Sequence, residues 1–168
     1  MNKKTVFAAA LAFLTLGVSA NYVLAHTGET HKKEANAPVS EDEHAFGKEG
    51  SLKKATRTIT VDMSDNMRFT PSDITVKQGE TIRFIVKNKG KMMHEMVIGT
   101  MDELKAHGEL MRKHPTMEHD EPYMSHVSPG KKENLVWQFT NVGEFYYACL
   151  VPGHFEAGMV GKITVVKG

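Results

Sequence analysis

One short stretch near the C-terminus carries three side chains that bind soft metal ions. Cys149, His154 and Met159 follow one another at intervals of five residues, and Cys149 is the only cysteine of the chain. A thiolate, an imidazole and a thioether together suit a soft or borderline transition metal. Singly, each residue type is most often structural; a lone cysteine, for example, is usually a small buried hydrophobe. Their spacing within one loop favours a metal site.

The loop lacks one ligand of a complete site, and His94 is the candidate for it. Two histidines and a cysteine with a weak methionine are the blue-copper ligand set. Zinc also takes one cysteine and two histidines, but the thioether of Met159 suits Cu(I) far better than zinc. The sequence therefore predicts copper, cycling between Cu(I) and Cu(II), with these ligands: His94, Cys149, His154 and Met159.

Residues 149–159 resemble the C-terminal copper loop of cupredoxins, the group of plastocyanin, azurin and auracyanin. The cysteine-to-histidine spacing, with Pro-Gly before the histidine, is similar to azurin and auracyanin. The Gly-Met ending is similar to plastocyanin and auracyanin. Residues 67–88 resemble the early strands of the family, and the resemblance covers roughly residues 55–168. It implies a type 1 copper centre in a Greek-key β-sandwich.

Glu95 departs from the pattern of that family, in which many members carry an asparagine after the first histidine ligand. That asparagine usually ties the two ligand loops together. Here we expect Glu95 and Glu156 to be solvated. The loop shows no convincing acid–base pair or nucleophile, so the residues do not predict an enzyme with an organic substrate; Cu(I) oxidation is the one reaction that they suggest.

The N-terminus has the pattern of a secretory signal. Lys3 and Lys4 precede an apolar run over residues 6–18 that is too short for a comfortable membrane span. Small residues allow cleavage after Ala20 or Ala25, and we favour Ala25. We therefore expect residues 1–25 to direct export to the periplasm, with no membrane insertion after cleavage. An unpaired cysteine in that oxidising compartment needs a reason, and metal ligation supplies one.

The mature chain divides into a polar tail and one domain. The full length of 168 residues favours a single domain, and the net charge of +1 over those residues gives no reason to expect nucleic-acid binding. Residues 26–54 have almost no large apolar side chains, so we expect a disordered tail. In that tail, His26 with its α-amine, together with His31, would form a possible tail site for Cu(II); the alternative is an ordinary polar linker.

Short alternating segments separated by turn residues dominate the remainder, residues 55–168. They predict strands at residues 56–63, 73–77, 81–88, 94–98, 133–139, 144–149 and 160–167. This indicates an all-β domain, an antiparallel β-sandwich like that of cupredoxins. Residues 101–113 have a helical pattern with acidic residues first and basic residues last, and form an insertion that Pro115 ends. We expect residues 114–129 to be a polar loop.

The insertion holds a second group of histidines and methionines: Met101, His107, Met111, His114, Met117, His119, Met124 and His126. We predict a possible second copper site that draws on Met111, His114, Met117, His119, Met124 and His126. Thioethers suit Cu(I), and imidazole suits copper in either state. The alternative is that Met111 belongs to the core and that the histidines are solvated. The same combination, with a His-bearing tail, resembles periplasmic cupredoxins associated with bacterial copper tolerance.

Two function classes follow from these patterns. The extra histidines and methionines favour a copper-tolerance protein that binds, buffers or oxidises periplasmic copper. The alternative is a one-electron carrier, whose redox protein partner would dock on apolar surface near His154 formed by Leu150, Val151 and Phe155; ordinary loop packing explains those three residues equally well. A third and weaker hypothesis is a domain that assists a larger copper enzyme.

Overall fold

The computed structural model describes residues 39–115 and 119–168. The predicted signal peptide, the tail histidines His26 and His31, and Met117 lie outside these ranges. Within them, no helix is long and apolar enough to span a membrane.

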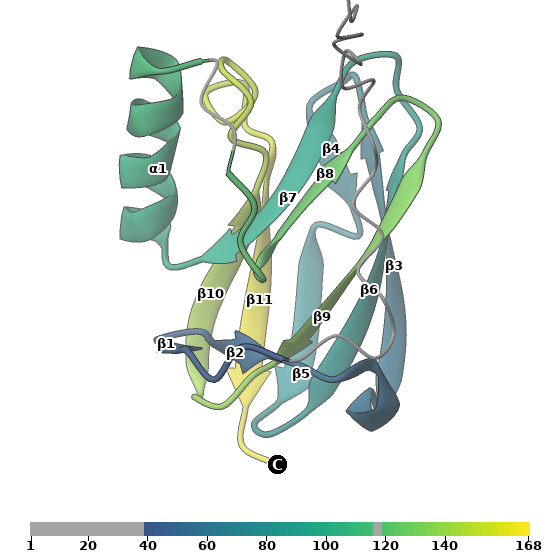
Figure 1. Cartoon of the computed structure of the whole chain (residues 1–168), viewed down its shortest axis with the longest axis vertical. Coiled ribbons are helices and arrows are strands. Elements are labelled where there is room, and N and C mark those ends of the chain that lie inside the picture. Colours follow the sequence, from purple (N-terminus) through teal and green to yellow (C-terminus); the bar gives the residue numbers. More distant parts are fainter. Residues whose placement is uncertain (1–38, 116–118) are drawn as a thin grey trace, which may run out of the picture. The chain divides into compact units, whose positions relative to one another are not determined.

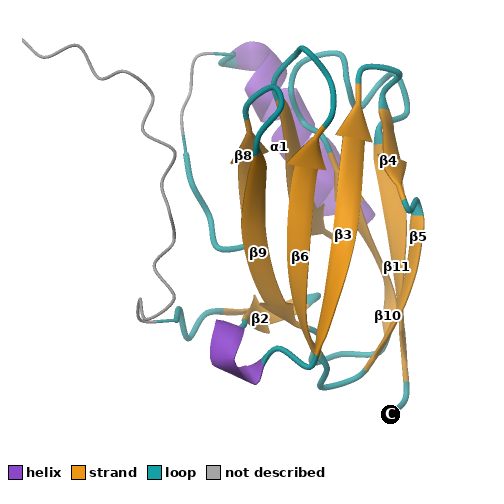
Figure 2. Ribbon diagram, turned by 90° about the vertical axis from the view of Figure 1, so that its right-hand side faces the viewer, coloured by secondary structure: helices purple, strands orange, loops and turns teal. Residues whose placement is uncertain are grey.

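Two β-sheets form the domain (Figure 1). The first sheet has six strands in the order β1-β2-β9-β6-β3-β4: Glu43–His44, Gly47–Glu49, Lys132–Gln138, Thr81–Asn88, Arg57–Ser64 and Arg68–Thr70. The second has five in the order β5-β11-β10-β7-β8: Asp73–Lys77, Val160–Val166, Gly143–Ala148, His94–Gly99 and Met124–Val127. Figure 2 shows β9, β6 and β3 side by side in the first sheet.

The predicted β-sandwich is confirmed, and all seven predicted strands form within one or two residues of their expected bounds. Two pairings are parallel, β3 with β6 and β5 with β11, so the sheets are mixed rather than purely antiparallel. Parallel neighbours cannot be joined by a tight hairpin and need a longer connection. In both cases other strands lie in the connecting segment. Alternating hydrophobicity locates each strand but does not show which strands pair in parallel.

The core lies between the two sheets. In β6, Ile82, Phe84 and Val86 are fully buried, and the residues between them are partly exposed. This alternation is the physical basis of the strand prediction, since successive side chains of a strand point to opposite faces. Cys149 and Met159 belong to the same apolar cluster. The predicted metal loop is therefore a continuation of the core.

Helix α1 spans Met101–Lys113, as predicted. Thr100 and Glu103 form a capping box at its start: the Thr100 hydroxyl accepts the Glu103 N–H, and the Glu103 carboxylate accepts the Thr100 N–H. The helix buries Leu104 and Met111 in a second apolar cluster with Leu150. This packing holds the insertion against the strand and loop that carry Cys149.

The expected disordered tail is wrong for residues 39–54, which are part of the fold. Strand β2 pairs with β9, and a short 3-10 helix follows at Leu52–Lys54. Phe46 is 2% exposed, and its carbonyl accepts the indole N–H of Trp137 at 2.9 Å. The prediction rested on the average composition of the segment. Such an average does not show that one residue, Phe46, is buried and holds the segment to the domain.

The expected polar loop after α1 also contains a strand, β8, which pairs with β7. The register places His126 opposite Glu95 and Met124 opposite Val97. Four residues with a serine and a histidine among them give little periodic signal. Pairing with an already buried neighbour, rather than local pattern, makes this segment a strand.

Candidate metal centre

His94, Cys149 and His154 meet at one point, and we call this group the Cys149 centre. His94 opens β7, Cys149 follows the last residue of β10, and His154 lies five residues further on. β7 and β10 are paired neighbours, so their ends bring two ligands together. One ligand atom from each residue lies within 4.8 Å of the others, and all three side chains are buried. Groups at these distances could hold a metal ion.

Both imidazoles present the same nitrogen to the sulfur. The Cys149 Sγ lies 3.3 Å from Nδ1 of His154 and 3.9 Å from Nδ1 of His94. On the far side of its ring, Nε2 of His94 lies 3.0 Å from the Asp65 carboxylate. A carboxylate on one ring nitrogen keeps the proton there and leaves a lone pair on the other. In neutral His94 the lone pair is therefore on Nδ1, which is the ring nitrogen that faces Cys149.

Asp65 is a residue of this centre that the sequence did not indicate. It lies in the turn between β3 and β4, and its carboxylate also accepts the Lys91 N–H at 2.8 Å. That backbone contact, and then His94, hold the pKa of Asp65 below its usual range. Asp65 thus remains ionised and anchors both the ring of His94 and the loop before it.

Burial controls the protonation of the centre. It raises the pKa of the Cys149 thiol to about 12, although the N–H of Glu95 acts in the opposite direction. It also lowers the pKa of His154, and neighbouring His94 adds to that effect. Near neutral pH Cys149 is therefore a thiol. A thiol and two imidazoles in a buried pocket fit copper, whose binding would displace the thiol proton.

The loop between Cys149 and Met159 is closed by its own backbone. The Cys149 N–H donates to the Met159 carbonyl at 3.1 Å, and the Met159 N–H donates to the His154 carbonyl at 3.0 Å. Gly153 has φ +90, with open space where a Cβ would lie, so backbone conformation and not crowding requires glycine there. Met159 is fully buried beside Cys149 in the core.

Glu95 ties the two ligand loops together, and the expectation that it is solvated was wrong. It is 2% exposed. Its N–H donates to the Cys149 Sγ at 3.4 Å, and its Oε1 accepts the Leu150 N–H at 2.8 Å. Its Oε2 lies 3.0 Å from Nε2 of His126. Glutamate here makes the loop-to-loop connection that the resemblance assigned to asparagine. It also contacts His126 on β8.

Glu156 behaves as the sequence suggested, since its side chain is exposed and its one described ion pair is with Arg112 at 3.4 Å. Leu150 lies in the second apolar cluster, which is loop packing rather than surface. Val151 and Phe155 are partly exposed. Of the three predicted surface residues, two thus reach solvent beside His154.

The predicted second group of ligands separates in the structure. Met111 and Met124 are 8% and 2% exposed and pack in the second apolar cluster. His114 is the exposed C-cap residue of α1. Of the described histidines in this predicted group, His119 and His126 lie near each other, with ring centroids 6.4 Å apart.

His107 joins these two histidines; the sequence places it in the same histidine–methionine group, although it was not among the predicted ligands. Its Nε2 lies 2.6 Å from Nε2 of His119. Burial, and then the neighbouring His119, lower the pKa of His107. It lies three residues after the buried Leu104, at the edge of the packed helix face. We call His107, His119 and His126 the imidazole cluster.

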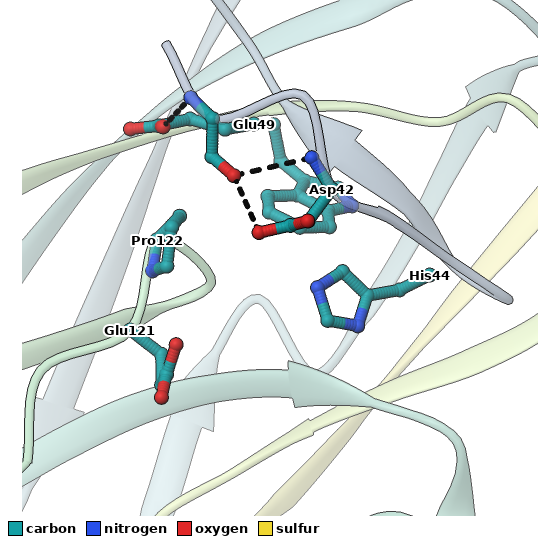
Figure 3. Close-up of a pocket in the computed structure, with 7 residues that line it drawn as sticks. Asp42, His44, Glu49, Glu121 and Pro122 are labelled. Atoms are coloured by element: carbon teal, nitrogen blue, oxygen red, sulfur yellow. Dashed lines mark hydrogen bonds between the residues drawn. The ribbon is translucent and has the colours of Figure 1, made fainter. Parts of the chain in front are cut away.

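A small pocket of about 100 Å³ lies elsewhere, beside β1 and β2 (Figure 3). The residues around it are Ser40, Asp42, His44, Glu49, Glu121, Pro122 and Trp137. Its polar groups bond to each other: the Ser40 hydroxyl donates to Asp42 at 2.9 Å, and the Ser40 N–H donates to Glu49 at 2.7 Å. No ligand of the Cys149 centre lines it.

Comparison with known proteins points to copper. The family model described as copper binding proteins of the plastocyanin/azurin family matches residues 55–166. The copper-resistant cuproprotein CopI of Rubrivivax gelatinosus is 49% identical over 141 residues, which cover 84% of this chain and 81% of that protein. CopI of Vibrio cholerae, also a copper-resistant cuproprotein, is 34% identical over 174 residues, covering 98% and 100%.

Solved structures agree in fold. A reduced auracyanin from Roseiflexus castenholzii superposes with a TM-score of 0.58 at 23% identity, covering 67% of this chain and 98% of that one. An azurin from Methylomonas sp. strain J gives 0.54 at 19% identity, covering 67% and 100%. At such identities the likeness shows the sandwich fold alone.

Proposed function

This chain belongs to the plastocyanin/azurin family of copper-binding proteins, and we propose that its copper site is the Cys149 centre. The observation that carries the proposal is the convergence of His94, Cys149 and His154 in a buried group. Met159, fully buried on the same loop, is the proposed weak fourth ligand. Copper bound there would supply a one-electron Cu(I)/Cu(II) couple.

The chain's own residues hold the centre in place before metal arrives. Asp65 fixes the ring of His94, and Glu95 fixes Leu150 next to Cys149. The Arg68 guanidinium donates to the Ala157 carbonyl at 2.9 Å and holds the far side of the loop. Ligands held in this way move little between the two copper states, and the apolar core under them excludes water.

We further propose that the protein serves copper tolerance in the periplasm. Relatives that match most of this chain at 34–49% identity are copper-resistant cuproproteins. The N-terminal pattern of a basic pair, an apolar run and small residues supports export. An unpaired thiol that is 0% exposed and faces two imidazoles is consistent with a metal ligand in an oxidising compartment.

One observation favours the electron carrier as a second candidate. Met92 and Met93 are 42% and 44% exposed and directly precede the buried His94. With the partly exposed Val151 and Phe155, they provide apolar surface on the two segments that carry the histidine ligands. A redox protein partner would use such surface to approach the centre.

The test of the copper site is a Cu(II) titration of the full chain followed by optical absorption. An intense thiolate-to-copper band is expected and should vanish in Cys149→Ser. Met159→Leu is the matched control, because a weak axial ligand changes the band and the potential but not retention of copper. An unchanged band in Cys149→Ser would contradict the proposed site.

The test that separates tolerance from electron transfer is genetic. In a copper-sensitive strain that lacks the gene, the wild-type chain should restore growth on copper and Cys149→Ser should not. Replacing the exposed Met92 and Met93 by Ser leaves the proposed ligands intact and should preserve tolerance. If this double variant instead slows respiratory electron transfer while copper tolerance is unchanged, the electron-carrier function is favoured.

A further inference from the structure

Glu95 is a buried acidic residue that adjoins the Cys149 centre on two sides. It follows His94 directly in β7. Its N–H donates to the Cys149 Sγ at 3.4 Å, and its Oε1 accepts the N–H of Leu150, the residue after Cys149, at 2.8 Å. The carboxylate therefore lies against the peptide unit that joins Cys149 to Leu150.

Among residues 39–115 and 119–168, no lysine or arginine forms an ion pair with the Glu95 carboxylate. Its Oε2 instead meets Nε2 of His126 at 3.0 Å. An imidazole N–H satisfies that oxygen, but a neutral ring does not offset its charge. Burial of a charge without an opposite charge is unfavourable, so stability alone would favour a neutral side chain at this position.

A neutral side chain of the same shape would make the same contact between the two loops. Glutamine also has an oxygen that accepts the Leu150 N–H, and it buries no charge. What glutamate adds is a fixed negative charge in the interior, where charges act more strongly than in water. Burial is the main cause of the shifted pKa values of Cys149 and His154, and the Glu95 charge acts on both residues as well. The charge therefore reaches two of the three groups of the centre.

Resting on the copper site proposed above, we propose that the Glu95 carboxylate lowers the reduction potential of copper in the Cys149 centre. Cu(II) carries one more positive charge than Cu(I), so a fixed negative charge nearby stabilises Cu(II) more. The backbone bond from Glu95 to the sulfur also affects the potential, but it does not depend on the side chain. Glu95 is thus a positioning residue whose charge makes Cu(II) the favoured bound state. Such a centre suits a protein that holds copper as Cu(II) rather than Cu(I).

Glu156 provides a matched comparison on the ligand loop itself. It lies two residues after His154, yet its side chain is 48% exposed and pairs with Arg112 at 3.4 Å. Water and salt screen an exposed charge, and the guanidinium offsets it. Loss of the Glu156 charge should therefore have little effect on the potential, although this residue is as close in the chain to a ligand as Glu95 nearly is.

The experiment is a redox titration of the copper-loaded full chain, followed at the thiolate band at pH 8, where an ordinary imidazole is neutral. Glu95→Gln retains the acceptor for Leu150 and removes the charge. It should raise the potential by at least about 59 mV, a tenfold change in the ratio of Cu(I) to Cu(II) affinity. Glu156→Gln should shift the potential less than half as far. Competition with a Cu(I) chelator and a Cu(II) chelator measures the same ratio independently.

A second pair of variants leaves Glu95 in place. His126→Lys sets a fixed cation beside Oε2 and should also raise the potential, whereas His126→Gln keeps an N–H donor without charge and should not. A potential that stays the same or falls in Glu95→Gln, equal shifts in Glu95→Gln and Glu156→Gln, or no rise in His126→Lys would overturn the role of the charge. Absence of the thiolate band in the wild-type chain would instead contradict the copper site, so the two failures are distinguishable.

Discussion

The Cys149 centre and the imidazole cluster are built on different kinds of backbone. The first takes its histidine and cysteine from the ends of paired strands, and its three ligands are at most 9% exposed. The second takes its histidines from a helix, a loop and a four-residue strand, and the His126 side chain is 36% exposed. Rigid ends keep a geometry fixed, whereas a loop allows adjustment. The first arrangement would suit retention of a metal, whereas the second leaves its imidazoles freer to adjust.

The two regions also differ in what holds each ligand. In the Cys149 centre, His94 is fixed by Asp65, and the sulfur accepts the N–H of Glu95. In the imidazole cluster, His107 and His119 mainly contact each other. Glu95 is the residue that both regions share, since it also contacts His126. Changes at Glu95 and Asp65 therefore test whether the regions are independent.

The largest effect is expected for Glu95→Ala, which removes a contact from both regions. The buried Leu150 N–H loses its acceptor, and an unsatisfied buried donor costs about 1–3 kcal/mol. The free energy of unfolding of the metal-free protein should fall by that amount in urea titrations. Glu95→Gln, the control, retains an acceptor oxygen and should lose less. Equal losses in both variants would show that charge, not the hydrogen bond, is the stabilising feature.

A smaller and one-sided effect is expected for Asp65→Ala. Without the carboxylate, the ring and tautomer of His94 are no longer fixed, and loss of such an outer contact costs about 10- to 100-fold in metal affinity. Competitive titration should show this loss at the thiolate band only. Any copper held by the imidazole cluster should not change. Parallel weakening of both sites would mean that the two regions are not separate.

The smallest expected effect concerns the number of protons released when copper binds, which should differ by one between the two regions. The pKa of Cys149 is raised to about 12, so the thiol is protonated at pH 7 and must lose its proton to bind metal. Affinity at this centre should therefore rise with pH. The pKa of His107 is lowered, so loss of a proton from this residue should contribute little to metal binding at pH 7. Calorimetric copper titrations in buffers of different ionisation enthalpy measure the release, which Cys149→Ser should abolish at the first centre. Equal release by both sites would contradict the comparison.

Local pattern in the sequence was sufficient for much of the molecule. Alternation located the strands of the sandwich, because a half-buried strand has a period of two. Acidic residues at one end and Pro115 beyond the other located α1, since these features act within a turn or two of the helix. The spacing of Cys149, His154 and Met159 indicated a metal loop because those three residues lie on one short segment.

Contacts between distant segments were decided by the tertiary structure. Asp65 meets His94 across 29 residues, and Phe46 meets Trp137 across 91. The register of β7 with β8 places Glu95 opposite His126, and the packing of α1 brings His107 to the loop beyond it. Sheet register and helix packing follow from the shape of the whole core. A hydrophobic pattern shows which face of a segment is buried, but not which residue of another segment it will meet.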